Sequence, residues 1–171
     1  NGVELLARLD SQPHVGGSYN VYGEANYTYA HGVFKNGTKE VPGEDDDDPP
    51  TIVDYSGNHL PEVPFHVAAL TVGLQNTTGW KWDASVTWTY RGSFFTDEDN
   101  TAFGFDPEGE NGEVPSIWLL SARFHLDIGE TGASVYVAGD NLLDEFYISD
   151  REDGLKPGQG RTIWTGFKYK F

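Results

Sequence analysis

The chain has 171 residues, 27 acidic against 11 basic side chains, a formal net charge of −16, and neither cysteine nor methionine. This charge argues against binding to nucleic acid, because neutralising phosphates requires clustered lysine and arginine. The lack of cysteine excludes disulfides, zinc–thiolate sites and thiol nucleophiles. No run approaches the roughly 18 apolar residues of a membrane-spanning helix, and the first residues do not form a signal peptide.

Seven segments alternate apolar and polar residues, and this period of two is typical of β-strands with one apolar face. The fourth segment is the plainest, with Trp82, Val86 and Tyr90 on its apolar register. In chain order the expected strands are 3–10, 19–29, 66–74, 82–91, 118–127, 135–147 and 163–171.

The connections between these strands alternate in length. Short connections are expected at 11–18, 76–79 and 129–132, and long outer loops at about 36–64, 97–115 and 149–160. This alternation predicts an antiparallel up-and-down sheet whose short turns all lie at one end. The apolar stripes lack a second apolar face to pack on, and they end in aromatic residues, which favours a lipid-facing band above a polar lumen. The predicted fold class is therefore an all-β, antiparallel up-and-down transmembrane β-barrel.

The acidic residues are concentrated in two of the long loops. Residues 38–64 carry a net charge of −7, and residues 97–115 carry another −7. The predicted strands are consequently close to neutral, as a sheet embedded in a bilayer requires.

Two motifs near the end of the chain carry a family resemblance. The last strand has alternating aromatic residues at Phe167, Tyr169 and Phe171, which resembles the terminal signal that the barrel-assembly machinery of bacterial outer membranes recognises. Upstream lie Asn-Leu-Leu-Asp-Glu-Phe-Tyr at 141–147 and Pro-Gly-Gln-Gly-Arg at 157–161. In this order and spacing, the motifs resemble the C-terminal end of TonB-dependent outer-membrane receptors.

This resemblance implies a 22-stranded barrel, of which residues 1–171 form the C-terminal part with about seven strands, and an N-terminal plug that lies outside this sequence. It implies import of a ferric chelate, of siderophore or iron-citrate type, across the bacterial cell outer membrane with energy from the TonB complex. Outer-membrane lipid and lipopolysaccharide are the expected surroundings. Seven strands alone would leave two unpaired edges in hydrocarbon, at a cost of several kcal/mol per unsatisfied group, so we expect the closing strands in a longer protein.

Four arginines are candidates for binding an anionic chelate, because a guanidinium makes permanently charged, bidentate contacts with carboxylates. They are Arg91, Arg123, Arg151 and Arg161. For the first two, an arginine–aspartate ladder along the lumen wall is the favoured alternative. For Arg151, local pairing within its Arg-Glu-Asp run is more plausible.

A run of four aspartates in the first long loop offers oxygen ligands for a surface Ca²⁺ ion, although it lacks the spacing of an EF-hand. The run comprises Asp45, Asp46, Asp47 and Asp48. A solvated loop, or divalent cations bridging it to lipopolysaccharide phosphates, are the alternatives. By register His125 faces the lumen and His66 the apolar side, and neither has the spacing of a metal ligand.

No triad order, phosphate-binding glycine loop or carboxylate pair indicates catalysis, so neither an enzyme nor a resident cofactor is predicted. Two other functions stay open. A soluble, secreted carbohydrate-binding β-sandwich would use its tryptophans to stack on sugars, although interfacial anchoring explains their position better. A small passive outer-membrane pore or adhesin would need at least one further strand.

Overall fold

The protein is described by a computed structural model that covers residues 1–12, 17–42, 49–102, 109–151 and 154–171. Its elements are strands throughout, and within these residues no helix has the length and apolar character needed to cross a membrane. The strands are β1 (Gly2–Asp10), β2 (Tyr19–Ala30), β3 (Thr38–Val41), β4 (Thr51–Asp54), β5 (His66–Asn76), β6 (Trp82–Arg91), β7 (Phe94–Phe95), β8 (Glu113–Val114), β9 (Ile117–Asp127), β10 (Ala133–Asp140), β11 (Ile148–Asp150), β12 (Lys156–Pro157) and β13 (Thr162–Tyr169).

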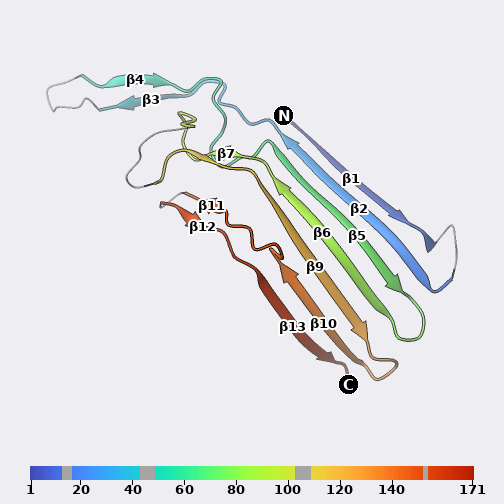
Figure 1. The fold of residues 1–171 in the computed structure, drawn as a ribbon. Coiled ribbons are helices and arrows are strands. Elements are labelled where there is room, and N and C mark those ends of the chain that lie inside the picture. Colours follow the sequence, from blue (N-terminus) through green and yellow to red (C-terminus); the bar gives the residue numbers. More distant parts are fainter. Residues whose placement is uncertain (13–16, 43–48, 103–108, 152–153) are drawn as a thin grey trace.

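Seven of these strands form one sheet in the order β1-β2-β5-β6-β9-β10-β13, and every neighbouring pair is antiparallel. Figure 1 shows them side by side, with β1 and β13 at the two edges. The predicted up-and-down meander of seven strands is confirmed. Spatial order follows chain order because each strand returns directly beside its predecessor.

The two ends of the sheet differ as predicted. The turns between β1 and β2, β5 and β6, and β9 and β10 lie at one end, and the long connections lie at the other (Figure 1). Gly129 and Gly132 have positive φ angles of 55° and 77°, so the β9–β10 turn uses backbone conformations that favour glycine. Each long connection, predicted as a loop, instead contains a short hairpin: β3–β4, β7–β8 or β11–β12.

The sixth strand is shorter than predicted. We expected it to continue to about residue 147, but β10 ends at Asp140. Asn141 and Asp144 have positive φ angles of 47° and 58°, and a left-handed backbone cannot continue a pleated strand. The Asn141 amide stabilises the resulting turn, because its Oδ1 accepts a bond from the Glu145 N–H at 2.9 Å.

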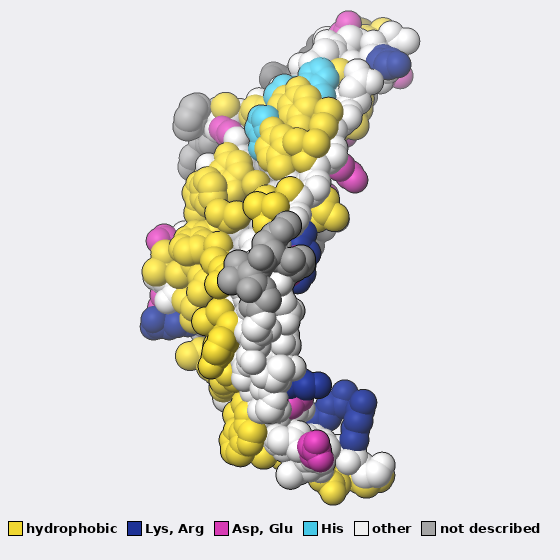
Figure 2. All heavy atoms as spheres, turned by 90° about the vertical axis from the view of Figure 1, so that its right-hand side faces the viewer, with side chains coloured by type: hydrophobic (Ala, Val, Ile, Leu, Met, Phe, Trp, Pro, Cys, Tyr) yellow, Lys and Arg dark blue, Asp and Glu magenta, His cyan; other side chains and the backbone are white. Residues whose placement is uncertain are grey.

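The two faces of the main sheet differ sharply. Residues such as Leu5, Ile163 and Phe167 share the apolar face, and they remain 60%, 63% and 66% exposed. Figure 2 shows hydrophobic side chains gathered along one side of the sheet. No second sheet covers this face in the described part of the chain, so the β-sandwich alternative is wrong.

The few buried hydrophobic side chains lie in the long connections rather than on the sheet. They are Tyr55, Phe94 and Val114. The sheet therefore has no core of its own among the described residues, and its apolar face needs an apolar environment.

Candidate functional site

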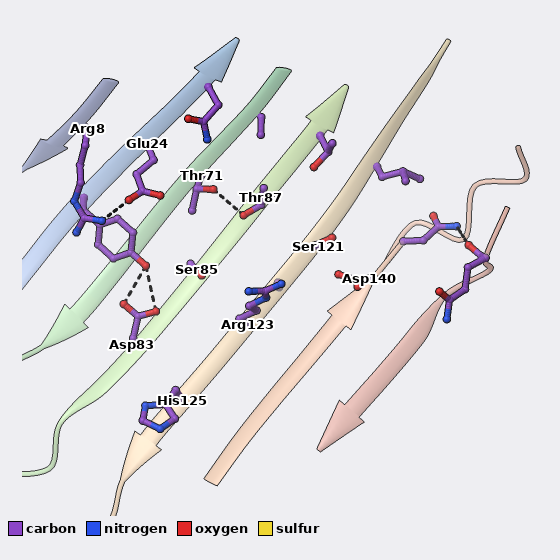
Figure 3. A pocket seen from close by; sticks show the side chains of 18 of the residues that line it. Arg8, Glu24, Thr71, Asp83, Ser85, Thr87, Ser121, Arg123, His125 and Asp140 are labelled. Carbon is purple, nitrogen blue, oxygen red and sulfur yellow. Dashed lines mark hydrogen bonds and ion pairs between the residues drawn. The ribbon is translucent and has the colours of Figure 1, made fainter. Parts of the chain in front are cut away.

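The polar face of the sheet forms an open cavity of about 790 Å³. Figure 3 shows side chains from β1, β2, β5, β6, β9 and β10 pointing into it. Alternate residues of each strand supply these side chains, because successive residues of a strand point to opposite faces. Hydroxyls form the floor, and the Thr71 and Thr87 hydroxyl oxygens are 2.8 Å apart.

A charged network crosses four strands at one side of this cavity (Figure 3). The Arg8 guanidinium donates to Asp10, with Nε 2.8 Å from Oδ2, and also pairs with Glu24. It lies over the Tyr22 ring at 4.9 Å from the ring centroid, within the range of cation–π attraction. The Tyr22 hydroxyl donates to Asp83, 3.0 and 3.1 Å from the two carboxylate oxygens.

Glycines allow two tyrosines to lie flat across the polar face. A Cβ atom on Gly73 would overlap the Tyr22 ring, and one on Gly166 would overlap the Tyr136 ring. The Tyr22 hydroxyl can therefore reach from β2 across β5 to Asp83 on β6. Tyrosine packing over a glycine of the neighbouring strand also stabilises a sheet at its weakest residue.

The structure does not bring the four predicted arginines together. Arg123 lines the cavity, and within the described residues it makes neither a hydrogen bond nor an ion pair. The Arg161 guanidinium lies 3.7 Å from an Asp144 carboxylate oxygen, and its main-chain N–H donates to that carboxylate at 2.9 Å. Among the four arginines, Arg123 is thus the one that lines the cavity and has no partner among the described residues.

Arg91 and Arg151 contact main-chain carbonyls of the long connections. Arg91 donates to Ile148 at 2.9 Å and to Ser149 at 3.0 Å. Its guanidinium carbon lies 5.0 Å from the Phe94 ring centroid, and its Nε is buried without a hydrogen-bond partner. The Arg151 Nε donates to the Gly109 carbonyl at 2.9 Å.

Arg8, Tyr22 and Asp83 were not among the site residues predicted from the sequence. Their positions on the polar register of three strands were visible in the sequence. The signal for their contact was Gly73 on β5, the strand between β2 and β6, because a glycine there leaves room for the Tyr22 ring.

Histidine and acidic residues do not form a metal centre in the part of the chain that the structure describes, since no group of three is suitably arranged. His125 lines the cavity, with its Nε2 3.6 Å from an Asp127 carboxylate oxygen. His66 lies on the apolar register, with its Nδ1 2.8 Å from the Tyr27 hydroxyl. The predicted calcium run, residues 45–48, lies outside the described residues.

A family model for the TonB-dependent receptor-like β-barrel matches residues 1–142. The chain belongs to the TonB-dependent receptor family. This confirms the predicted family and the all-β barrel class, and a family of receptors agrees with the prediction that the chain is not an enzyme.

Among solved structures, the barrel is similar to the unliganded ferric citrate transporter FecA, with a TM-score of 0.71 and 24% sequence identity. The match covers 99% of this chain and 24% of FecA, so the chain spans about a quarter of that transporter's length. At this identity the similarity shows the shared fold. A comparison with curated proteins found no match.

Proposed function

We propose that the protein is an outer-membrane receptor that imports a small ferric chelate, of siderophore or iron-citrate type, with energy from the TonB complex. Membership of the TonB-dependent receptor family carries this proposal. The structural neighbour FecA is described as a ferric citrate transporter, which supports an iron chelate as the ligand.

The geometry of the main sheet supports a place in the bacterial outer membrane. Its strands are 8 to 12 residues long, close to the roughly 9–11 residues that a tilted strand needs to cross a bilayer. One face carries exposed apolar side chains, and the opposite face carries the polar cavity. Lipid would cover the first face, and the lumen would lie on the second.

The ligand would meet the polar face rather than the acidic loops. Residues 38–64 and 97–115, in two of the long connections, each carry a net charge of −7, and such loops repel an anionic chelate. Arg123 on β9 is the proposed contact, since its guanidinium faces the cavity and has no partner among the described residues. We expect further ligand contacts in the earlier strands and the plug of the longer protein.

The remaining partners rest on the family resemblance and on chemistry. Lipopolysaccharide would surround the outer end, where Asp45–Asp48 would hold Ca²⁺ as a surface ion. Phe167, Tyr169 and Phe171 would form the signal for the barrel-assembly machinery; Phe167 and Tyr169 lie on β13 at the edge of the sheet. No resident cofactor is proposed.

Uptake of radioactive iron tests the proposed function. Cells that lack the native gene would be complemented with the full-length protein and given one of two anionic chelates, ferric citrate or a ferric catecholate. We expect uptake of one of these chelates, and loss of that uptake in cells that lack TonB. Uptake of neither chelate above the level of the gene-deleted cells would refute the proposed import.

The Arg123→Gln variant tests the proposed contact. At subsaturating chelate we expect uptake to fall at least fivefold, because a charge-assisted contact is worth more than about 1 kcal/mol. Lys39→Gln on the exposed hairpin strand β3 removes a positive charge away from the cavity, and it is the matched control. Equal effects of the two substitutions would show that Arg123 is not a specific contact.

A further inference from the structure

Hydrogen bonds link the three long connections at one end of the sheet. We call residues 31–65 the first connection, 92–116 the second and 141–161 the third, and their described residues together the outer rim. In Figure 1 the hairpins of all three lie at the same end of the sheet. Hydrogen bonds between connections that are far apart in the sequence indicate that the connections form one structural unit rather than three independent loops.

Asn100 joins the second connection to the first. Its side-chain amide accepts a bond from the His59 N–H at 2.6 Å and donates to the His59 carbonyl at 3.0 Å. These two hydrogen bonds to the main chain of one residue imitate the pairing with a neighbouring β-strand. The Glu62 N–H also donates to the Phe95 carbonyl at 2.7 Å. Asn100 has a positive φ of 58°, which asparagine tolerates better than most residues.

Two arginines join the third connection to its neighbours, Arg91 to the end of β6 and Arg151 to the second connection. Arg91, at the end of β6, donates to the carbonyls of Ile148 and Ser149 across 57 and 58 residues of sequence. Arg151 reaches back from the third connection to the Gly109 carbonyl. Both guanidinium groups thus donate to main-chain carbonyls of the outer rim.

The second connection, which lies between the other two in this network, has a buried interior. Val114 is fully buried, and the Asp97 carboxylate is 8% exposed. Asp97 accepts bonds from the Thr101 N–H and hydroxyl and from the Gly112 N–H, each at 3.1 Å. A buried carboxylate with several donors orders the loop around it. The described residues around Asp97 can therefore support the neighbouring connections.

We propose that Arg91, Arg151 and Asn100 are positioning residues that hold the three connections together as one preassembled outer rim. A chelate that arrives from outside then meets a rim of fixed shape, and these two arginines do not bind it. The assembly of the rim follows from the structure alone, whereas its importance for import rests on the proposed function.

Cross-linking between introduced cysteines tests the assembly without any ligand. Residues 1–171 contain no cysteine, so introduced thiols report on chosen pairs. Asn58→Cys with Glu98→Cys spans the first and second connections, where the Asn58 amide now donates to the Glu98 carbonyl at 2.8 Å. Glu113→Cys with Ser149→Cys spans β8 and β11, which approach within 8 Å between Cα atoms.

The full-length protein in its native membrane would be treated with a short bis-thiol reagent. We expect both cysteine pairs to cross-link rapidly. Combining Arg91→Gln and Arg151→Gln should slow the second pair at least fivefold and leave the first unchanged. Asn100→Ala should slow the first pair. Arg123→Gln also removes an arginine charge, but Arg123 lies on strand β9 outside the outer rim. This variant should change neither cross-linking rate.

Equal cross-linking rates with and without these arginines would overturn the positioning role. Slow cross-linking of both pairs in the otherwise unchanged protein would overturn the preassembled rim. Resistance of each variant to unfolding by heating in detergent would be measured first, so that a misassembled barrel is not mistaken for a loosened rim.

Uptake of radioactive ferric citrate by the cross-linked protein provides a second, separate readout. We expect uptake within twofold of the uncross-linked protein, because a fixed rim has no need to open between its connections. Loss of uptake only after cross-linking would show that the connections must separate. Absence of uptake both before and after cross-linking would count against the proposed import, while the cross-linking rates would still decide whether the rim is assembled.

Discussion

The hydrogen bond between Tyr22 and Asp83 offers the sharpest test of the network on the polar face. Tyr22→Phe removes the hydroxyl but keeps the ring over Gly73 and beneath Arg8. A hydrogen bond to a charged group contributes about 1.5–3 kcal/mol to stability. Because both side chains are only half-buried, we expect about 1.5 kcal/mol, the lower end of that range.

A double-mutant cycle separates this bond from the other effects of each substitution. The free energy of unfolding of the full-length protein in lipid vesicles would be measured for Tyr22→Phe, Asp83→Asn and the double variant by urea titration. If the bond accounts for the loss, the second substitution adds little to the first, and the coupling is about 1.5 kcal/mol. If the stability losses of the two single variants sum to the loss of the double variant within about 0.5 kcal/mol, the reasoning is refuted.

Tyr136→Phe is the matched control for this cycle. The Tyr136 ring covers Gly166 as Tyr22 covers Gly73, but its hydroxyl has no hydrogen bond among the residues that the structure describes. We therefore expect a change below about 0.5 kcal/mol, typical of a substitution that removes no buried contact. A loss as large as that of Tyr22→Phe would show that the phenol hydroxyl acts through solvation rather than through Asp83.

Three further predictions concern the turn after β10, the first hairpin and the two faces of the sheet. Asn141→Ala should lower the free energy of unfolding by about 3 kcal/mol, since Asn141 is 3% exposed and makes three hydrogen bonds; the same urea titration measures this, and a loss below about 1 kcal/mol would contradict it. Hydrogen bonds from the Ser56 hydroxyl and N–H hold the pKa of the Asp54 carboxyl below its ordinary value. Asp54 therefore stabilises its hairpin fully when the pH is above the ordinary aspartate pKa of about 4. This contribution to stability is lost as the pH falls through the lowered pKa of the folded state. Ser56→Ala should raise that pKa, as NMR titration would report, and an unchanged value would contradict the assignment. In single-tryptophan variants, brominated lipid should quench Trp88 on the apolar face and spare Trp164 on the polar register, whereas equal quenching would contradict the assigned faces.

The sequence by itself determined the seven strands of the main sheet, apart from the end of the sixth, together with their order and the two faces of the sheet. The alternation in 82–91 is a local pattern with a period of two, and the pleat of a strand turns this pattern directly into one apolar and one polar face. Short turns such as 129–132 leave adjacent strands no alternative to antiparallel pairing. These features depend on residues within about ten positions of one another, so they could be predicted without a structure.

Only the tertiary structure decided what the polar side chains do. Arg91 and Arg151 were candidates for ligand binding because a guanidinium suits anions, but their partners are main-chain carbonyls 42 to 58 residues away. Main-chain carbonyls are present at every residue, so the sequence contains no signal that selects Gly109 or Ser149 as an acceptor. Arg123 keeps its predicted place because its position depends on strand register alone, whereas the roles of the other two depend on how the long connections fold against each other.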